Sequence, residues 1–369
     1  MLHFTFYFFI LIIIVQISYY LLIFGRFSFA KKTDSKKNQN IPISVIVCAK
    51  NEEINIQKYI PLLLQQNYLN FEIVLIDDAS SDETLEIFEK FEKENKNVKL
   101  IKVQNNEAFW GNKKFALTLG IKSATYENLL FIDADCYPET LNWITEMSSH
   151  FNNDKTIILG HGAFEKVENS FLNKIIRFEN LLTATQYFAW TLVGKPYMGV
   201  GRNLGYTKSE FFKTNGFINH MKIRSGDDDL FVNEAANSNN TSINYNWESF
   251  TYSKAKTTFK DWILQKRRHV ATAKYYKTFD KMQLGLFYSS QLLFILLATV
   301  LLIFQFQWII ILILIAVRYL FSWLSLGYAS GKLYEKDVMY FYPIIEIVLI
   351  FTQLHVFARN LISKPVHWK

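Results

Sequence analysis

The most constraining feature of this chain is a short apolar run that stops at two acids. Residues 129–132, LLFI, are followed at once by Asp133 and Asp135. A buried strand with carboxylates at its C-terminal end is how an α/β sheet presents acids to a ligand crevice. Two carboxylates brought together by a turn suit a hard divalent cation that also holds phosphate oxygens. Taken alone, the same pattern also fits a solvated turn.

A regular alternation of strand-like and helix-like segments begins at Ile41. Strands are predicted at residues 43–48, 71–78, 98–103 and 128–133, and helical segments at 51–67, 80–91 and 111–124. This rhythm predicts an α/β fold with a doubly wound, mostly parallel sheet. Ligands bind at the C-terminal strand ends of such sheets, and the acids lie there. Ser80 and Glu83 fit a capping box for the helix that runs through Phe91.

The apolar residues are concentrated at the two ends of the chain. They make up 50% of the 369 residues and gather at 4–24 and from about 284 onward. The first run is long enough to cross a bilayer as a helix. A cleaved signal peptide would need a basic start and a shorter apolar core. Here the basic residues follow the run, at Arg26, Lys31, Lys32, Lys36 and Lys37. We therefore expect an uncleaved anchor in the cell membrane, with a cytoplasmic domain after it.

Three further apolar segments are predicted at about 284–304, 308–327 and 338–361. The last contains Pro343, Glu346, His355 and Arg359. Ionisable groups at membrane depth line a protein-buried or wet path, which favours a helix buried among others. The alternative is a re-entrant or interfacial helix that never crosses. Three full crossings would leave the C-terminus outside, whereas the basic tail 363–369 prefers the cytoplasm, which favours the non-crossing alternative.

The composition disfavours a disulfide-stabilised fold and a nucleic-acid-binding protein. Cys48 and Cys136 fall at separate predicted strand ends, so we expect no disulfide and a reducing compartment. The net charge is +7. We attribute it to basic residues that favour the cytoplasmic side of the membrane, because the sequence has no basic motif interleaved with aromatics that would indicate nucleic-acid binding.

Six motifs occur in an order that is typical of one family. They are ISVIVCAKNEE (43–53), IDDASSDET (76–84), WGNKKFAL (110–117), FIDAD (131–135), GDDD (226–229) and QKRRH (265–269). Together they resemble the family 2 glycosyltransferases with a nucleotide-diphosphosugar transferase (GT-A) fold. The resemblance covers roughly 41–277, with membrane helices on either side as in the membrane-bound members. It implies an inverting, metal-dependent enzyme that uses a UDP- or GDP-linked sugar.

The resemblance also implies roles for the donor-binding residues. The nucleobase would be held by Ala49, Asn51, Glu52, Asp77 and Asp78. Asp78 is expected to make the direct contact, since a carboxylate can accept from a base N–H. For Glu52 and Glu53, a helix start that complements the helix dipole is the alternative.

The expected diphosphate and cation sites follow the same resemblance. In the stretch from Gly111, Lys113 and Lys114 would approach the diphosphate, with a solvated helical face as the alternative. Asp135 is expected to bind Mg²⁺ or Mn²⁺, with Asp133 close to the cation and to the sugar or ribose.

The acid triplet Asp227, Asp228 and Asp229 is where the family keeps its general base. A base is needed because the acceptor hydroxyl must lose its proton as it attacks. Asp228 is expected to be that base, with a register uncertain by one residue. An acid cluster at a helix start is the alternative.

QKRRH departs from the family's Q-x-x-R-W. Gln265 and Arg268 match, but His269 stands where the family has tryptophan, which puts acceptor stacking and processive synthesis in doubt. A basic amphipathic helix, 259–277, on an anionic leaflet is the alternative or additional reading. Gly201, Arg202 and Asn203 of MGVGRN are expected to form an acceptor floor, with a plain turn as the alternative.

The sequence therefore predicts five parts: an anchor (1–25), a basic linker (26–40), a GT-A catalytic domain (41–256), an interfacial helix (257–281) and C-terminal membrane helices (282–369). The expected activity is transfer of a sugar to a lipid-linked or membrane-proximal glycan acceptor. The alternatives are a processive polysaccharide synthase and a non-catalytic membrane scaffold.

Overall fold

The computed structural model describes residues 1–31, 41–104, 113–223 and 225–363. Gly111, most of the predicted basic linker and most of the basic tail lie outside these ranges. The chain forms two compact units. The sheet unit contains Thr33–Glu168 and Gly194–Lys256, and the helical unit contains Met1–Lys32, Asn169–Val193 and Thr257–Lys364. The segment Asn169–Val193, which the sequence pattern placed inside the catalytic domain, thus belongs to the helical unit.

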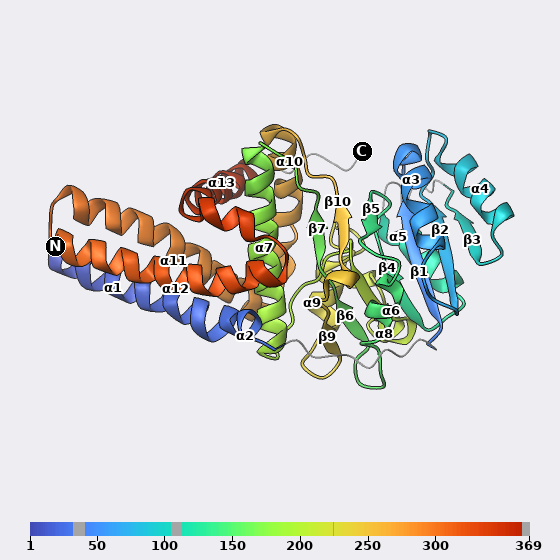
Figure 1. Cartoon of the computed structure of the whole chain (residues 1–369), viewed down its shortest axis with the longest axis horizontal. Helices are drawn as coiled ribbons and strands as arrows, with labels where there is room; N and C mark the ends of the chain where they lie inside the picture. The colour runs from blue at the N-terminus through green and yellow to red at the C-terminus, as the bar shows by residue number, and fades with distance from the viewer. Residues whose placement is uncertain (32–40, 105–112, 224, 364–369) are drawn as a thin grey trace. The chain divides into compact units, whose positions relative to one another are not determined.

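A seven-stranded sheet in the order β3-β2-β1-β4-β8-β6-β9 forms the sheet unit (Figure 1). Its strands are β1 (Ile43–Ala49), β2 (Phe71–Asp77), β3 (Val98–Lys102), β4 (Asn128–Phe131), β6 (Ile157–Leu159), β8 (Leu204–Thr207) and β9 (Thr241–Ile243). The first four strands along the chain pair in parallel. β8 runs antiparallel to both of its neighbours. The prediction of an α/β fold with a mostly parallel sheet is therefore confirmed.

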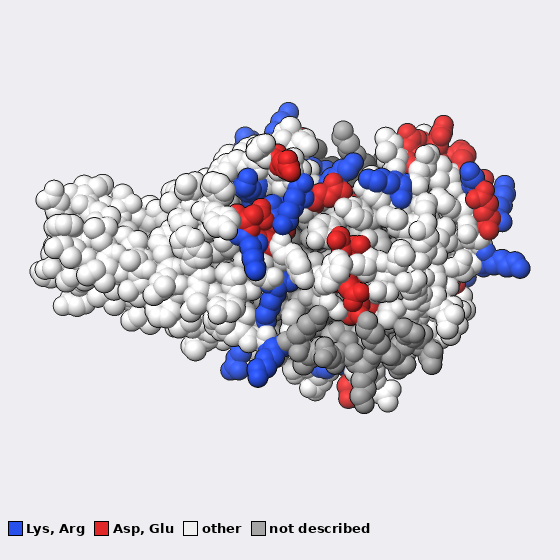
Figure 2. Space-filling view, in the orientation of Figure 1, with Lys and Arg blue, Asp and Glu red and all other residues white. Residues whose placement is uncertain are grey.

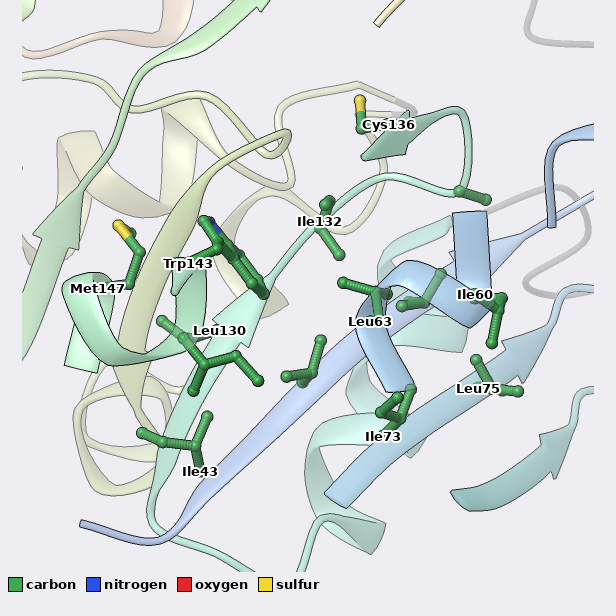
Figure 3. Close-up of a cluster of buried hydrophobic side chains, with 14 of the residues drawn as sticks. Ile43, Ile60, Leu63, Ile73, Leu75, Leu130, Ile132, Cys136, Trp143 and Met147 are labelled. Carbon is green, nitrogen blue, oxygen red and sulfur yellow. The ribbon is translucent and has the colours of Figure 1, made fainter. Parts of the chain in front are cut away.

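Helices cover both faces of the parallel strands. They are α3 (Glu53–Leu64), α4 (Thr84–Glu94), α5 (Lys113–Ser123) and α6 (Trp143–Ser148), and the unit also holds α8 (Lys208–Lys213) and α9 (Asp229–Ala235). Side chains of α3 and α6 meet Ile73, Leu75 and Leu130 in one apolar core (Figure 3). On the other face α5 lies very close to the sheet, because a Cβ at Gly120 would fall 2.1 Å from Ile76 Cδ1. Glycine thus lets α5 bring its N-terminal lysines down onto the strand ends.

A second, three-stranded sheet was not predicted from the sequence. It has the order β5-β10-β7, with β5 (Cys136–Pro138), β10 (Thr251–Ser253) and β7 (Gly162–Phe164). Each strand is three residues long, too short to give an alternating apolar pattern. Because β5 follows Asp135 directly, this sheet fixes the far side of the turn that carries the two acids.

The predicted capping box at Ser80 and Glu83 is wrong. α4 begins at Thr84, and Glu83 makes no side-chain cap hydrogen bond. Asp82 Oδ1 accepts from the Thr84 N–H (3.1 Å) instead. Ser80 Oγ accepts from the backbone N–H of Asn51 (3.1 Å), so this serine ties two loops together rather than capping a helix.

Within the part of the chain that the structure describes, four helical segments of the helical unit are long and apolar enough to cross a membrane: Leu2–Ser28, Thr278–Ile303, Trp308–Lys332 and Lys336–Ile362. The first comprises α1 (Leu2–Ser18), a π-helical turn η1 (Tyr19–Phe24) and α2 (Gly25–Ser28). The others are α11 (Thr278–Ile303), α12 (Trp308–Lys332), and η5 (Lys336–Phe341) followed by α13 (Tyr342–Ile362).

Among the described residues, the helical unit also contains α7 (Phe171–Leu192) and α10 (Phe259–Val270). α10 is shorter than the helix predicted at 259–277, because a short 3₁₀ turn, η4 (Ala273–Tyr275), separates it from α11. Within this unit α1, α11 and α12 lie along one another, and α7 runs across one end of them (Figure 1). Lys and Arg side chains gather where the long apolar part of the unit ends (Figure 2).

Candidate functional site

The acids predicted from the motifs lie at one edge of the parallel sheet. Asp77 ends β2, and Asp133 and Asp135 follow β4. β1 lies between these two strands and pairs in parallel with both. Since the carboxyl ends of parallel strands meet at one edge, the three acids and the end of β1 lie along the same edge of the sheet.

The two loops that the resemblance assigns to the nucleobase are tied to each other. Asn51 adopts a left-handed backbone, with φ of 56°, and its Oδ1 accepts from the N–H of Ser81 (2.8 Å). The N–H of Glu52 donates to Thr84 Oγ1 (2.9 Å). Asn51 therefore holds the loop after β1 against the loop after β2, a role that its place in a motif did not reveal.

The two adjacent aspartates differ in what they bind. Asp77 is buried and accepts from the Ser80 N–H (3.3 Å), which shapes the turn. The Asp78 N–H donates to the carbonyl of Ala49 (2.9 Å), and its carboxylate lies 4.0 Å from Lys50 Nζ. Burial raises the pKa of Asp78, and the charge of Lys50 offsets part of this.

Glu52 is held at the start of α3. Asn55 Nδ2 donates to its carboxylate (2.6 Å). Burial raises the pKa of Glu52, with the hydrogen bond from Asn55 acting in the opposite direction. Glu52 is the N-cap residue of α3, but its side chain makes no cap hydrogen bond to the helix backbone.

Asp133, Asp135 and Cys136 form a group that fits a divalent cation. One ligand atom from each lies within 4.8 Å of the others. Cys136 Sγ donates to Asp135 Oδ1 (3.3 Å), and burial raises the pKa of this thiol well above its ordinary value. The thiol therefore stays protonated, and the two carboxylates supply the oxygen ligands that Mg²⁺ and Mn²⁺ prefer.

Lys113 joins this acid pair to the acid triplet. Its Nζ lies 2.7 Å from Asp133 Oδ1 and 3.1 Å from Asp227 Oδ2. Burial alone would lower the pKa of Lys113, but the charges of Asp133 and Asp227 raise it well above its ordinary value. A permanently charged ammonium group thus stands between two acidic segments that are far apart in the sequence.

The same residues line one small cavity. Lys113, Asp133, Asp227 and Asp228 contribute polar groups, and Gly201 borders them. The rest of the wall is mostly apolar and comes from the sheet and α5: Ile46, Cys48, Leu117, Phe131, Ile132, Leu204 and Tyr206. A charged rim over an apolar wall strengthens the electrostatic effect of each group on its neighbours.

Asp228 is the N-cap of α9. Its Oδ1 accepts from the Asp229 N–H, and its Oδ2 accepts from the Gly201 N–H, both at 2.7 Å. Gly226 precedes the triplet with φ of +86°, a conformation that L side chains rarely adopt, so glycine makes the turn that presents the acids. Asp229 accepts from the N–H of Leu230 (2.7 Å).

The pKa values of the neighbouring Asp227 and Asp228 are pushed apart. Burial, with Asp227 and Asp229 beside it, raises the pKa of Asp228 to about 7. Burial acts the same way on Asp227, but the Lys113 charge outweighs it and the pKa of Asp227 is lowered. Two close carboxyl groups with opposite shifts are the pattern of an acid–base site, in which the group near pH 7 exchanges the proton.

Lys114 has a different role from the diphosphate contact that its motif implied. Its side chain is fully buried, and its Nζ donates to the carbonyls of His220 (3.0 Å), Ile223 (2.9 Å) and Ser225 (2.8 Å). Burial lowers its pKa to about 8. Lys114 thus fastens the loop that leads into the acid triplet.

We expect Lys114→Met to destabilise the sheet unit, because each buried acceptor left without a donor costs about 1–3 kcal/mol. The melting temperature of the full chain should fall by several degrees. Lys122→Met, at an exposed lysine of the same helix α5, is the matched control and should melt near the wild type. Equal melting temperatures for wild type and Lys114→Met would contradict the fastening role.

The predicted acceptor floor is mostly structural. Asn203 is fully buried, accepts from Trp143 Nε1 (3.1 Å) and donates to the carbonyls of His161 (2.9 Å) and Ser249 (2.6 Å). The Arg202 guanidinium lies 4.2 Å from the ring of Phe164. Of the three residues, Gly201 is the one that lines the cavity, and it binds Asp228 through its backbone N–H. Because this contact is made by a backbone N–H, no pattern of side chains in the sequence could predict it.

Gln265, Arg268 and His269 lie on α10 in the helical unit. The buried arginine of QKRRH is Arg267, which the motif comparison passed over. Its Nε donates to Asn360 Oδ1 (2.9 Å), and its Nη2 donates to the carbonyl of Ser363 (2.7 Å). Arg267 thus joins α10 to the end of α13.

Known proteins resemble this chain in sequence and in fold. Residues 44–224 match the model of the family described as Glycosyl transferase family 2. An uncharacterized glycosyltransferase from Haemophilus influenzae is 30% identical over 151 residues, which cover 40% of this chain and 42% of that protein. The poly-beta-1,6-N-acetyl-D-glucosamine synthase of Staphylococcus aureus is 34% identical over 110 residues, which cover 30% and 26%. The chain thus spans less than half the length of these relatives.

A solved structure shares the fold. A mannosyltransferase from Pyrobaculum calidifontis, in complex with GDP-Man and Mn²⁺, aligns with a TM-score of 0.55 at 15% identity and covers 87% of this chain and 97% of that one. The matched sequence region contains the tied loops, Lys113 and the Asp133–Asp135 pair, and the structural match extends well beyond it. Residues 44–224 therefore form a glycosyl transferase family 2 domain with the GT-A fold.

Proposed function

We propose that this protein is a membrane-bound, metal-dependent, inverting glycosyltransferase that moves a sugar from a nucleotide-diphosphosugar to an acceptor hydroxyl near the membrane. One observation carries the proposal. Lys113, Asp133, Asp227 and Asp228, from three separate segments, line a single cavity at the strand ends. Cation ligands, a fixed positive charge and a carboxyl group with a pKa near 7 are the parts that such a transfer needs.

Donor binding would use the groups around the crevice. Asp78 can accept from an N–H of uracil or guanine, and Asp135 with Asp133 would hold Mg²⁺ or Mn²⁺. The cation would neutralise the diphosphate that leaves as the glycosidic bond breaks. Lys113, already charged between Asp133 and Asp227, can turn its ammonium group to a diphosphate oxygen.

Proton transfer would fall to Asp228. The hydrogen bonds from Gly201 and Asp229 fix the orientation of its carboxylate. It would take the proton from the acceptor hydroxyl as the oxygen attacks the anomeric carbon on the face opposite the nucleotide. One displacement inverts the configuration, so one base suffices and no enzyme nucleophile takes part.

The acceptor in this proposal is a lipid-linked or membrane-proximal glycan, because four candidate membrane helices accompany the domain. A processive polysaccharide synthase is the second candidate, favoured by the similarity to the staphylococcal synthase. His269 in place of the family's tryptophan weighs against it. Nucleotide release from UDP- and GDP-sugars with Mg²⁺ or Mn²⁺ tests the proposal, and product length separates the two candidates. No release with any donor would contradict both.

A pH profile gives an independent test of the base. Asp228 must be deprotonated to accept a proton, and its pKa is raised to about 7, so it loses function as the pH falls below that value. We expect kcat/KM to rise with pH through about 7 and to drop about tenfold per pH unit below it. An unshifted aspartate, with a pKa of about 4, would give a flat profile from pH 5.5 to 8.5.

A further inference from the structure

A buried ion pair lies inside the apolar part of the helical unit. Arg318 is the only Lys or Arg between residues 282 and 331. Its Nη2 lies 2.6 Å from Glu346 Oε1, its Nη1 lies 2.7 Å from Glu346 Oε2, and both side chains are almost fully buried. A charge at membrane depth is costly unless it is paired, so this pair has a specific task.

The ion pair connects all four apolar segments. Arg318 Nε donates to Gln16 Oε1 (2.6 Å), and its Nη2 donates to Tyr20 Oη (3.1 Å). Gln291 Nε2 from α11 donates to Glu346 Oε1 (3.3 Å), and so does Tyr342 Oη from the start of α13 (2.9 Å). The first turns of α13 are thus held by groups of α1, η1, α11 and α12.

The ion pair lies deep in the bundle. Arg318 stands ten residues after the start of α12 at Trp308 and fourteen before its end at Lys332. At about 1.5 Å per residue, the pair is ~15 Å from one end of α12 and ~21 Å from the other. Glu346 is only the fifth residue of α13. α13 therefore begins far inside the bundle rather than at either surface.

One end of the bundle is marked by the end of α2 at Ser28 and the end of α12 at Lys332, and it is here called the basic end. The segment that contains α13 starts from this end. Lys332 Nζ donates to the carbonyls of Phe27 and Ala30, where the first apolar segment ends. α11 also begins at this end. It packs along the first apolar segment, and Tyr19 Oη of η1 donates to the carbonyl of Gln283 near the start of α11 (2.8 Å). η5 leads from Lys332 back toward the buried pair.

The segment also returns to the basic end. Asn360 and Ser363 bind Arg267 of α10. α10 precedes the start of α11 at Thr278, and it is tied to α7 by Lys266, whose Nζ lies 2.6 Å from Glu179 Oε1. α7 in turn packs against α2. Both ends of the segment therefore lie at the basic end, with Glu346 at the deepest point between them.

We propose that residues 334–363 form a re-entrant segment, which enters the membrane from the basic end, is pinned at depth by the Arg318–Glu346 pair, and returns to the same face. The chain then crosses the membrane three times rather than four. One face of α13 exposes Ile344, Ile347, Phe351 and Leu354, a stripe at helical spacing that suits contact with lipid. Ser363 then lies on the same membrane face as the end of α2 and the start of α11.

Labelling with a membrane-impermeant maleimide tests the topology of the full chain. Cys48 and Cys136 would be replaced by serine, and single cysteines introduced as Phe304→Cys, Lys93→Cys or one residue appended after Lys369. Phe304 marks the end opposite the basic end, and Lys93 marks the sheet unit. The appended cysteine should react from the same side as Lys93→Cys and the opposite side from Phe304→Cys. Reaction from the side of Phe304→Cys would overturn the proposal.

Paired substitutions test the pinning. Arg318→Leu or Glu346→Leu alone leaves one buried charge without a partner, whereas the double variant removes both charges. We expect each single variant to lower the melting temperature more than the double variant does, because an unpaired buried charge costs more than a missing pair. A double variant as unstable as the sum of the two single variants would show that the pair does not act as a unit and would overturn the pinning.

Discussion

Asp228→Asn should lower the rate of sugar transfer by about 100- to 10,000-fold, the usual contribution of a positioned base. Asparagine is nearly isosteric and keeps an oxygen that can accept from Gly201 or Asp229, so the turn and donor binding should survive. It cannot take a proton from the acceptor hydroxyl. The measurement is single-turnover transfer, together with the affinity for the nucleotide diphosphate.

The neighbouring acids are the controls for this prediction. Asp229 accepts from Leu230 within the first turn of α9, and Asp227 pairs with Lys113. Asn at either position should cost less transfer than Asp228→Asn. A large loss in Asp229→Asn with donor binding retained would move the base one residue along the chain. If none of the three variants loses transfer, the triplet is only a helix-start cluster.

Asp135→Asn should remove the cation dependence of donor binding. The change deletes a charged ligand from a site with two carboxylates. Loss of a residue that merely orients a metal ligand already weakens metal affinity by about 10- to 100-fold, so loss of the ligand itself should cost at least that much. The fold should persist, because the Asp135 side chain is exposed.

Titration of Mn²⁺ into the protein, with and without a nucleoside diphosphate, measures this effect directly. Asp154→Asn, another exposed acid of the sheet unit, is the matched control and should bind as the wild type does. Unchanged Mn²⁺ affinity in Asp135→Asn would remove Asp135 from the cation site.

Periodicity was sufficient to predict the parallel half of the sheet. The strands at Ile43, Phe71 and Asn128 are mostly apolar and mostly buried on both faces, whereas the edge strand at Val98 is half-buried. The same logic placed the acids at one edge. The three-residue strands of the second sheet gave no such signal, because their pairing depends on contacts between segments far apart in the sequence.

The sequence predicted which residues lie at the site better than it predicted what each of them does there. The spacing of Lys113 and Lys114 could not show which lysine faces the acids, because that depends on how close Gly120 lets α5 approach β2. Likewise, Asn51 and Asn203 stand in the right motifs but mainly satisfy backbone groups. Backbone contacts such as the one from Gly201 to Asp228 are independent of side-chain identity and leave no sequence pattern.

The most direct test of the proposed transfer is the configuration of its product. The full chain in membranes would be given UDP- and GDP-sugars with Mn²⁺ and a membrane lipid extract, and the anomeric configuration of the transferred sugar read by NMR. We predict transfer with inversion at the anomeric carbon, which Asp228→Asn abolishes. A product of retained configuration, or equal transfer by wild type and Asp228→Asn, would contradict the account.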